Sequence, residues 1–293
     1  MRKSIDIVRW LDSFHLADGA ISTELFRFGC PHAESPEQWG LDHRDTLIQV
    51  HHDYLSAGAE MLLAATFGAN LFNPLAEFDD TTLAEALHVL VALARQAAGE
   101  RIPVLASVGP LALFSSSDPG PVELGKQYRH HFEILKETEC DLIALETFTS
   151  LREAEIALEQ AAILDMPCVI TFAAGEDGSL EDGESLETWV SRIARTSALG
   201  LGCNCSPDIT QATEVASALS EISDLPVIMR PNSGQPDENG QFPISADTFA
   251  EMAFALYDAG VDLLGGCCGT TADHIRKTAR LLGDSQSDED GPE

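Results

Sequence analysis

Short apolar segments alternate with longer amphipathic segments along most of the chain. Most of the apolar segments are about four or five residues long and uninterrupted, which is typical of strands that are covered on both faces. Eight such strands are predicted, near residues 14–17, 61–65, 104–108, 142–145, 168–172, 201–204, 227–229 and 262–264. Buried strands of this kind indicate a parallel sheet rather than an antiparallel sheet with one face in water.

The amphipathic segments between these strands predict helices, over residues 45–57, 83–98, 151–164, 208–222, 246–259 and 272–282 among others. About eight strand–helix units in 293 residues match an α/β fold of the (β/α)8 TIM-barrel type, for which about 250 residues is typical. A doubly wound open sheet is the alternative that this pattern leaves open. We expect one barrel domain over residues 1–283. Residues 284–293 are acidic and polar with no apolar anchor, so we expect a disordered tail there.

The charge of the chain restricts its partners. The sequence has 17 basic and 48 acidic residues, which leaves a formal net charge of −31. Nucleic acids and anionic membranes are themselves polyanions, so neither is an expected partner. A strongly acidic protein of this kind suits a solution of high ionic strength, where salt screens its self-repulsion.

The sequence also indicates a cellular location. No apolar segment is long enough to span a membrane, and the N-terminus has no apolar signal-peptide core. The seven cysteines follow no regular framework, which suits a reducing compartment without disulfides. We therefore expect a cytoplasmic protein.

Polar residues that directly follow predicted strands are the first candidates for chemistry. Active-site residues of a (β/α)8 barrel lie at the C-terminal ends of the strands and in the loops after them. Asp18, Glu146, Cys205, Asn232 and the pair Cys267-Cys268 all have such positions. The barrel prediction therefore places these side chains at one face of the molecule.

The cysteine pair lies in the segment Gly265-Gly266-Cys267-Cys268-Gly269. Adjacent cysteines do not readily form a disulfide with each other, but flanking glycines allow both sulfurs to turn toward one metal ion. With Cys205 they make three thiols, and catalytic zinc typically keeps three protein ligands and one open position. The spacing alone leaves a second interpretation open, in which these are small buried side chains.

Other cysteines and histidines are expected to have structural roles. Cys140, Cys168 and Cys203 are interpreted as small core side chains. The pairs His51-His52 and His130-His131 lie on predicted helices, where adjacent side chains point about 100° apart, so neither pair is suited to chelate one metal. We interpret them as surface or packing residues.

A set of short motifs occurs in order along the chain. They are Asp18-Gly19-Ala20, Thr23-Glu24-Leu25, Val50-His51, Thr66-Phe67-Gly68-Ala69-Asn70, Ser107-Val108-Gly109-Pro110, Glu146-Thr147, Asn204-Cys205, Pro231-Asn232-Ser233-Gly234 and Gly265 to Thr271. With these motifs the chain resembles the homocysteine S-methyltransferase family of zinc-thiolate methyltransferases over roughly residues 14–282. It is also similar to the homocysteine-binding module of cobalamin-dependent methionine synthases.

The resemblance implies a metal centre and an activity. In this interpretation Cys205, Cys267 and Cys268 bind one catalytic Zn²⁺ at the C-terminal face of the barrel, and the sulfur of homocysteine completes the coordination. A zinc-bound thiol is deprotonated and stays nucleophilic on a metal that already carries thiolates. Methyl transfer to that sulfur then forms methionine.

The resemblance also implies roles in substrate binding. Asp18 and Glu146 are expected to hold the substrate ammonium, and the backbone around Gly19 is expected to bind its carboxylate. Asn232 is expected either as a displaceable zinc ligand or as a turn residue before Gly234.

The methyl donor is not defined by the sequence. S-methylmethionine or S-adenosylmethionine, or a corrinoid or folate-linked partner protein, are the candidate donors. Departures from the family pattern are Ala64-Ala65 where two polar residues are common, Ser22, and Arg230. Because of Ala64-Ala65, the alternative is a non-catalytic zinc-binding or thiol-binding barrel that has lost its donor site.

Overall fold

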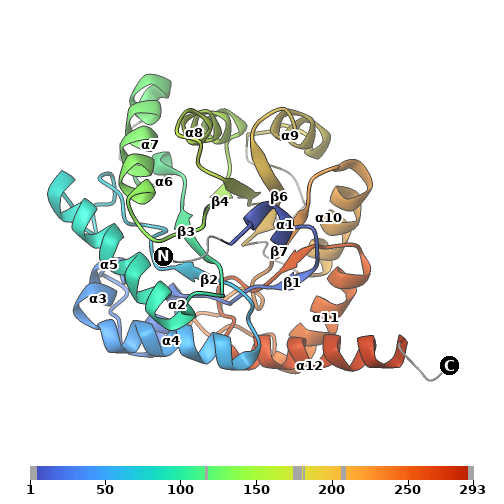
Figure 1. The fold of residues 1–293 in the computed structure, drawn as a ribbon. Coiled ribbons are helices and arrows are strands. Elements are labelled where there is room, and N and C mark those ends of the chain that lie inside the picture. Colours follow the sequence, from blue (N-terminus) through green and yellow to red (C-terminus); the bar gives the residue numbers. More distant parts are fainter. Residues whose placement is uncertain (1–4, 116–117, 174–179, 181, 206–208, 290–293) are drawn as a thin grey trace.

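Eight parallel strands form the centre of the molecule, and helices surround them (Figure 1). The computed structural model describes residues 5–115, 118–173, 180, 182–205 and 209–289. The strands are β1 (His15–Leu16), β2 (Leu62–Ala64), β3 (Val104–Val108), β4 (Leu142–Phe148), β5 (Cys168–Phe172), β6 (Ala198–Asn204), β7 (Val227–Arg230) and β8 (Leu263–Leu264). Hydrogen-bonded neighbours follow the order β1-β8-β7-β6-β5-β4-β3-β2.

This strand order is that of a closed barrel. Every neighbouring pair in the order is parallel, and β1 pairs with β8 through His15–Leu263 and Leu16–Leu264. At the two ends of the order, the Glu60 N–H donates a hydrogen bond of 2.8 Å to the Leu16 carbonyl and so connects β1 to the start of β2. A doubly wound sheet would change direction part-way through its order. The (β/α)8 prediction is therefore confirmed, and the open sheet is excluded.

The helices follow the strands in sequence and cover the outside of the barrel. They are α1 (Ile7–Trp10), α2 (Ser22–Arg27), α3 (Pro36–Asp42), α4 (Arg44–Ala57), α5 (Asp80–Ala98), α6 (Leu111–Phe114), α7 (Gly120–Lys136), α8 (Leu151–Ile163), α9 (Leu186–Ile193), α10 (Ile209–Ile222), α11 (Ala246–Asp258) and α12 (Ala272–Glu289). Several begin at side-chain caps; Asp79 and Thr82 form a reciprocal capping box at α5, and Ser150 accepts from the Glu153 N–H at α8. No helix in the described part of the chain is long and apolar enough to cross a membrane.

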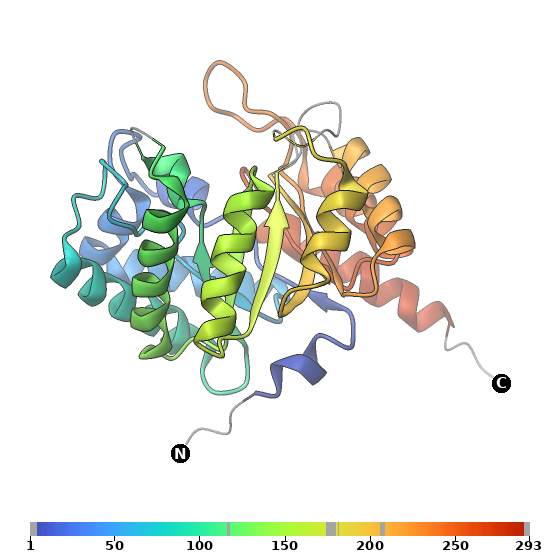
Figure 2. The same cartoon turned by 90° about the horizontal axis from the view of Figure 1, so that it is seen from above.

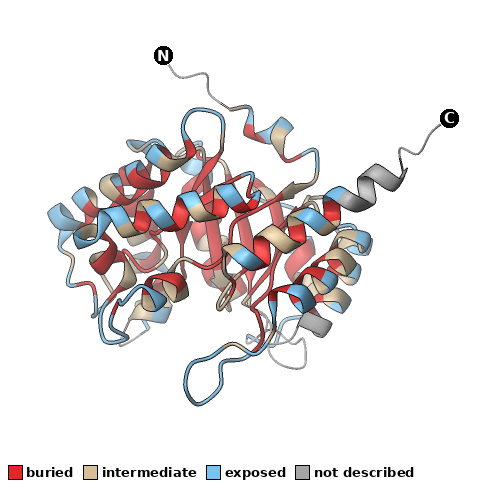
Figure 3. Ribbon diagram, turned by 90° about the horizontal axis from the view of Figure 1, so that it is seen from below, coloured by how far each residue is buried: buried red, intermediate tan, exposed pale blue. Residues whose placement is uncertain are grey.

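Two apolar clusters hold these layers together. One fills the barrel interior and contains inward-facing strand residues such as Leu105 and Ile228, together with Ile7 and Leu11 of the α1 segment. The α1 segment therefore covers the N-terminal end of the barrel, opposite the loop between β7 and α11 (Figure 2). The larger cluster lies between the strands and the surrounding helices. Figure 3 accordingly shows buried strands and helices that are buried on one side.

Each predicted strand overlaps an observed strand, but only two have the predicted bounds, those at 104–108 and 168–172. β4, β6 and β7 are longer than predicted, and β1, β2 and β8 are shorter. The largest difference is at the C-terminus. Helix α12 continues to Glu289, so the predicted helix end at residue 282 is wrong. The disordered tail predicted over residues 284–293 overlaps this helix and stays a prediction. Residues 290–293 lie outside the described residues.

Candidate active site

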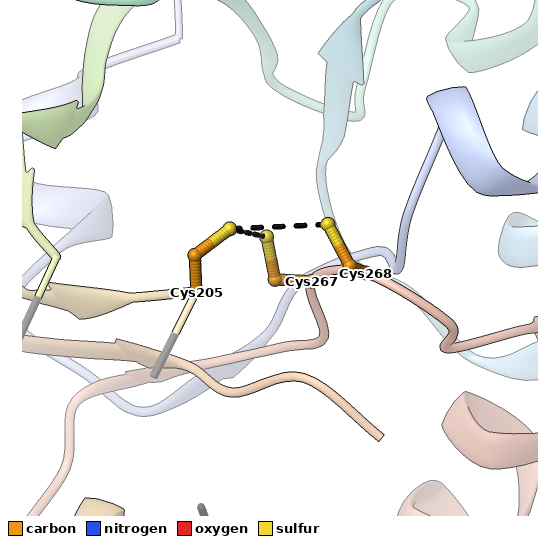
Figure 4. A group of neighbouring side chains, drawn as sticks. All are labelled: Cys205, Cys267 and Cys268. Atoms are coloured by element: carbon orange, nitrogen blue, oxygen red, sulfur yellow. Dashed lines mark hydrogen bonds between the residues drawn. The ribbon is translucent and has the colours of Figure 1, made fainter. Parts of the chain in front are cut away.

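Three cysteine sulfurs meet at the C-terminal end of the barrel (Figure 4). Cys205 directly follows β6, and Cys267 and Cys268 follow β8. The Sγ atom of Cys205 lies 2.7 Å from that of Cys267 and 4.0 Å from that of Cys268. All three sulfurs lie within 4.8 Å of one another, which makes them a candidate metal-binding group.

The backbone around each cysteine directs its sulfur to this point. Cys205 has a φ of +54°, a left-handed conformation that side chains other than glycine seldom adopt. Its N–H donates to the Arg230 carbonyl at 3.2 Å, which ties it to the end of β7. The Cys267 N–H donates to the Pro231 carbonyl at 2.8 Å. The segments that follow β6 and β8 are therefore both hydrogen-bonded to the end of β7, next to the sulfurs.

The glycines beside the cysteine pair leave no space for side chains. A Cβ on Gly266 would lie 2.3 Å from Thr270 Oγ1, and one on Gly269 would lie 2.1 Å from the ring of Phe242. Gly269 also has a φ of +79°. The turn therefore requires glycine both for close packing and, at Gly269, for its backbone conformation.

The three thiols suit a soft metal ion such as zinc. Zinc–sulfur bonds of about 2.3 Å place tetrahedral sulfurs about 3.8 Å apart, close to the 4.0 Å between Cys205 and Cys268. The 2.7 Å between Cys205 and Cys267 is shorter than that spacing, so a bound ion requires these two side chains to separate. Zinc binds well to thiolates, whereas calcium and magnesium prefer carboxylate oxygens. The residues present therefore fit a zinc ion.

The mutual contact of the thiols controls their ionisation. Hydrogen bonds from Cys205 and Cys267 lower the pKa of Cys268, because its thiolate accepts both. Hydrogen bonds with Cys267 and Cys268 raise the pKa of Cys205, because they favour its protonated thiol, and burial raises it further. Metal ions bind thiolates, so binding of a cation releases protons from this group.

Asn204 connects the metal-binding group to two other strands. Its Oδ1 accepts from the Thr147 N–H at 2.8 Å and from Thr171 Oγ1 at 2.7 Å, and its Nδ2 donates to Thr147 Oγ1 at 2.7 Å. The same Nδ2 lies 3.9 Å from the sulfur of Cys267. Asn204 therefore fixes the ends of β4, β5 and β6 relative to one another beside the cysteines.

Two buried carboxylates and one arginine form a charged cluster next to the sulfurs. Arg230, at the end of β7, forms ion pairs with Glu146 through Nη1 and with Asp18 through Nη2, the latter at 3.3 Å. Burial raises the pKa of Asp18 to about 7, although the Arg230 charge and the Leu63 N–H lower it. Burial also raises the pKa of Glu146 against the opposing effect of Arg230. The two carboxylates outweigh burial at Arg230 and raise its pKa, so the guanidinium is a permanent cation.

The sulfurs and the charged cluster share one cavity of about 140 Å³. Its lining includes all three cysteines together with Glu146 and Arg230. Gly19, Ala64, Ala65, Phe67 and the first residues of α2 also line it. A Cβ on Gly19 would lie 2.7 Å from the Tyr54 ring, so this wall too depends on glycine. The cavity therefore combines three thiols with charged side chains in one small space.

Comparison with known proteins identifies the family. The family model for homocysteine S-methyltransferase matches residues 15–282, which is nearly the whole chain. The chain belongs to the homocysteine S-methyltransferase family. Its members are named for methyl transfer to homocysteine, so this chain is of a methyltransferase family.

The individual relatives have low sequence identity to this chain. Homocysteine S-methyltransferase YbgG of Bacillus subtilis is 26% identical over 308 residues, covering 92% of this chain and 95% of that protein. Methionine synthase of Mycobacterium leprae is 27% identical over 267 residues, and the match covers 81% of this chain but only 21% of the synthase. The crystal structure of the metallated homocysteine methyltransferase MmuM from Escherichia coli superposes with a TM-score of 0.82 at 25% identity, covering 95% of this chain and all of that one.

The structure brings most of the predicted site residues of this family member together. Cys205, Cys267, Cys268, Gly19 and Glu146 line the one cavity. Asp18 is fully buried and is not among the lining residues, but it accepts hydrogen bonds from Arg230 and from the Leu63 N–H, and both of these residues line the cavity. Asn232 is buried nearby, and its Oδ1 has no hydrogen-bond partner in the described part of the chain, but it is not among the residues that line the cavity. Its predicted role as a metal ligand stays a prediction.

Two residues of the site were not predicted to act there. In the sequence, Arg230 is only a departure from the family pattern and Asn204 is only part of a motif. A signal for Arg230 is present in the sequence, because a charged residue directly follows the apolar strand segment Val227–Met229. Its partners Asp18 and Glu146 are far away along the chain, and sequence spacing does not reveal them.

Proposed function

We propose that this protein transfers a methyl group from an activated donor to the thiol of homocysteine and forms methionine. The observation that carries this proposal is the meeting of three thiols and a charged cluster in one cavity at the C-terminal face of the barrel. The thiol of homocysteine suits the three cysteines, and its charged amino-acid group suits the charged cluster. The names of the relatives, homocysteine S-methyltransferase and methionine synthase, support the same reaction.

We propose that Cys205, Cys267 and Cys268 hold a zinc ion as the cofactor. When bound, zinc keeps the acceptor thiol deprotonated and nucleophilic near neutral pH, so the chain needs no separate general base. Asn204 orients the cysteine group, and Ala64, Ala65 and Phe67 exclude water from the region beside it. The charged end of the acceptor is expected to lie at the cluster of Asp18, Glu146 and Arg230, which would fix the direction of its thiol.

We propose two alternative kinds of methyl donor. S-methylmethionine or S-adenosylmethionine carries a methyl group on a positively charged sulfur, which leaves as a neutral thioether. A corrinoid or folate-linked partner protein would instead present the methyl group at the open face of the barrel. The replacement of polar residues by Ala64 and Ala65 makes the cavity wall near the sulfurs apolar on that side.

The proposal is tested with purified protein of measured zinc content. Homocysteine is combined separately with S-methylmethionine, S-adenosylmethionine, methylcobalamin and methyltetrahydrofolate, and methionine is measured. We expect turnover with at least one donor at about one zinc per chain, and loss of turnover after chelation. Full zinc content without methionine from any donor would contradict the methyltransferase proposal and favour a non-catalytic thiol-binding barrel.

A further inference from the structure

Arg230 occupies the position between the two carboxylates that were expected to hold the substrate ammonium. Its guanidinium is buried, with 6% of the side chain exposed, and lies at the end of β7 in the wall of the cavity. Nη1 donates to Glu146 Oε1, while Nη2 donates to Asp18 Oδ1 at 3.3 Å and to the Gly19 carbonyl at 3.4 Å. The protein therefore supplies its own cation at this point.

The carboxylates have few unused acceptor positions. The second oxygen of Asp18 accepts from the Leu63 N–H at 2.8 Å. The second oxygen of Glu146 accepts from Ser107 Oγ at 2.5 Å. Each of the four carboxylate oxygens thus has a donor from the protein. A substrate ammonium would have to compete with a guanidinium that is covalently attached and already desolvated.

The guanidinium in turn has donors left over. A guanidinium carries five N–H groups in a fixed plane. The hydrogen bonds to Glu146, Asp18 and the Gly19 carbonyl use three of them and leave a second N–H on Nη1, in a residue that lines the cavity. The Nε also has no hydrogen-bond partner in the part of the chain that the structure describes, but it is buried next to Gly265. A free donor on a cation is best satisfied by an anionic acceptor. The unused chemistry at the charged end of the cavity is therefore that of an anion-binding group.

We propose that Arg230 is a specificity-determining residue, which replaces the ammonium between Asp18 and Glu146 and binds the carboxylate of the acceptor. On this basis the protein recognises thiols that carry a carboxylate, and an amino group on the acceptor contributes little. This inference rests on the proposed function, because it concerns the acceptor of that same site.

The experiment measures binding rather than turnover, so it does not depend on the donor. Zinc-loaded protein is titrated by calorimetry with homocysteine, with 4-mercaptobutanoate, which lacks the amino group, and with 3-aminopropane-1-thiol, which lacks the carboxylate. We expect the dissociation constant of 4-mercaptobutanoate to lie within about tenfold of that of homocysteine. We expect 3-aminopropane-1-thiol to bind about 100-fold more weakly, as for loss of a charge-assisted hydrogen bond.

The outcomes separate the inference from the proposed function. Tighter binding of 3-aminopropane-1-thiol than of 4-mercaptobutanoate, or equal weakening of both, would overturn the role of Arg230 while leaving homocysteine as the acceptor. No detectable binding of any of the three thiols would overturn the proposed function and the inference together. Chelated protein titrated with the same thiols shows how much of the affinity depends on the metal.

A variant tests the residue itself. In Arg230→Met the cation is lost and the two carboxylates are released, so we expect the preference to reverse toward 3-aminopropane-1-thiol. Arg230→Lys is the matched control, because it keeps a positive charge and should keep the preference for the carboxylate. An unchanged preference in a folded Arg230→Met protein would contradict the inference. If that variant does not fold by circular dichroism, the wild-type titrations alone decide.

Discussion

The three candidate metal ligands are all partly buried, and the sulfur of Cys268 lies farther from that of Cys205 than the sulfur of Cys267 does. At the scale of single residues, the site is a set of side chains held by backbone geometry rather than by packing. Substitutions at the cavity should therefore change chemistry more than stability.

Cys268→Ala is expected to lose zinc and methyl transfer together while the fold is retained. The substitution removes one of three proposed ligands at the cavity and leaves the apolar core unchanged. Zinc is measured by mass spectrometry, and folding by thermal unfolding. Cys140→Ala, which is distant along the chain and outside the cavity lining, is the matched control and should keep full zinc. Global unfolding of Cys268→Ala would indicate a structural metal instead.

His51 is expected to limit stability in acid. The side chain is fully buried in α4, and neither ring nitrogen has a hydrogen-bond partner in the described residues. Burial lowers the pKa of His51 from 6.5 to about 3. Between these two pH values the unfolded chain binds a proton that the folded protein does not. The stability that the neutral ring contributes is therefore present above pH 6.5 and is lost as the pH falls toward 3.

His51 is expected to lower the stability of the fold measurably already at pH 5. At pH 5 the loss from this one residue is about 2 kcal/mol relative to pH 8. His51→Leu should remove that part of the acid destabilisation, measured as the free energy of unfolding in urea at both pH values. His88→Gln is the control for replacement of an exposed histidine. An equally steep loss in His51→Leu would disprove the assignment.

At the scale of elements, the apolar segments predicted all eight strands, because strands covered on both faces need continuous apolar sequence. The predicted ends of the strands and helices are less accurate than their positions. β1 and β8 are only two residues long, although hydrogen bonds from the Ala17 N–H to the Leu264 carbonyl and from the Gly265 N–H to the Met229 carbonyl continue the contact between strands beyond these bounds. Helix α12 extends past the last apolar residue, which amphipathic periodicity cannot show.

Gly202→Ala is expected to prevent correct pairing of β6 with β7. A Cβ at this position would lie 1.8 Å from the Ile228 carbonyl oxygen, which is backbone and cannot rotate away. We expect destabilisation of about 3 kcal/mol or more, or failure to fold. Gly200→Ala, two residues earlier on the same strand, is the matched control. Its closest contact would be 3.1 Å, so it should cost about 1 kcal/mol. Similar urea midpoints for the two variants would contradict this explanation.

At the scale of the whole molecule, closure of the barrel places the ends of β4, β6, β7 and β8 beside one another, and the site is made there. In the folded molecule a formal net charge of −31 is also held in a small volume. The buried Arg95–Asp141 pair, with side chains 7% and 8% exposed, is shielded from solvent salt. The exposed acidic residues are not, so their repulsion should depend on ionic strength.

The melting temperature is therefore expected to rise with salt. Raising KCl from 0.01 to 0.15 M shortens the screening length from about 30 Å to about 8 Å. We expect an increase of roughly 5 °C, measured by differential scanning calorimetry at constant pH. Sucrose at the same osmolarity is the control and should have little effect. A constant or falling melting temperature would show that acidic repulsion does not limit the stability of this fold.

Local periodicity and short motifs were sufficient to predict the barrel, the position of the cysteines at strand ends and the family. The contacts among the charged residues, in contrast, depend on the tertiary structure. Arg230 lies 84 positions from Glu146 and 212 from Asp18 along the chain, and it is the closing of the barrel that brings the three charges into contact. A long-range ion pair of this kind leaves no periodic signal in the sequence. The carboxylates predicted to await a substrate ammonium are, in the folded protein, already paired.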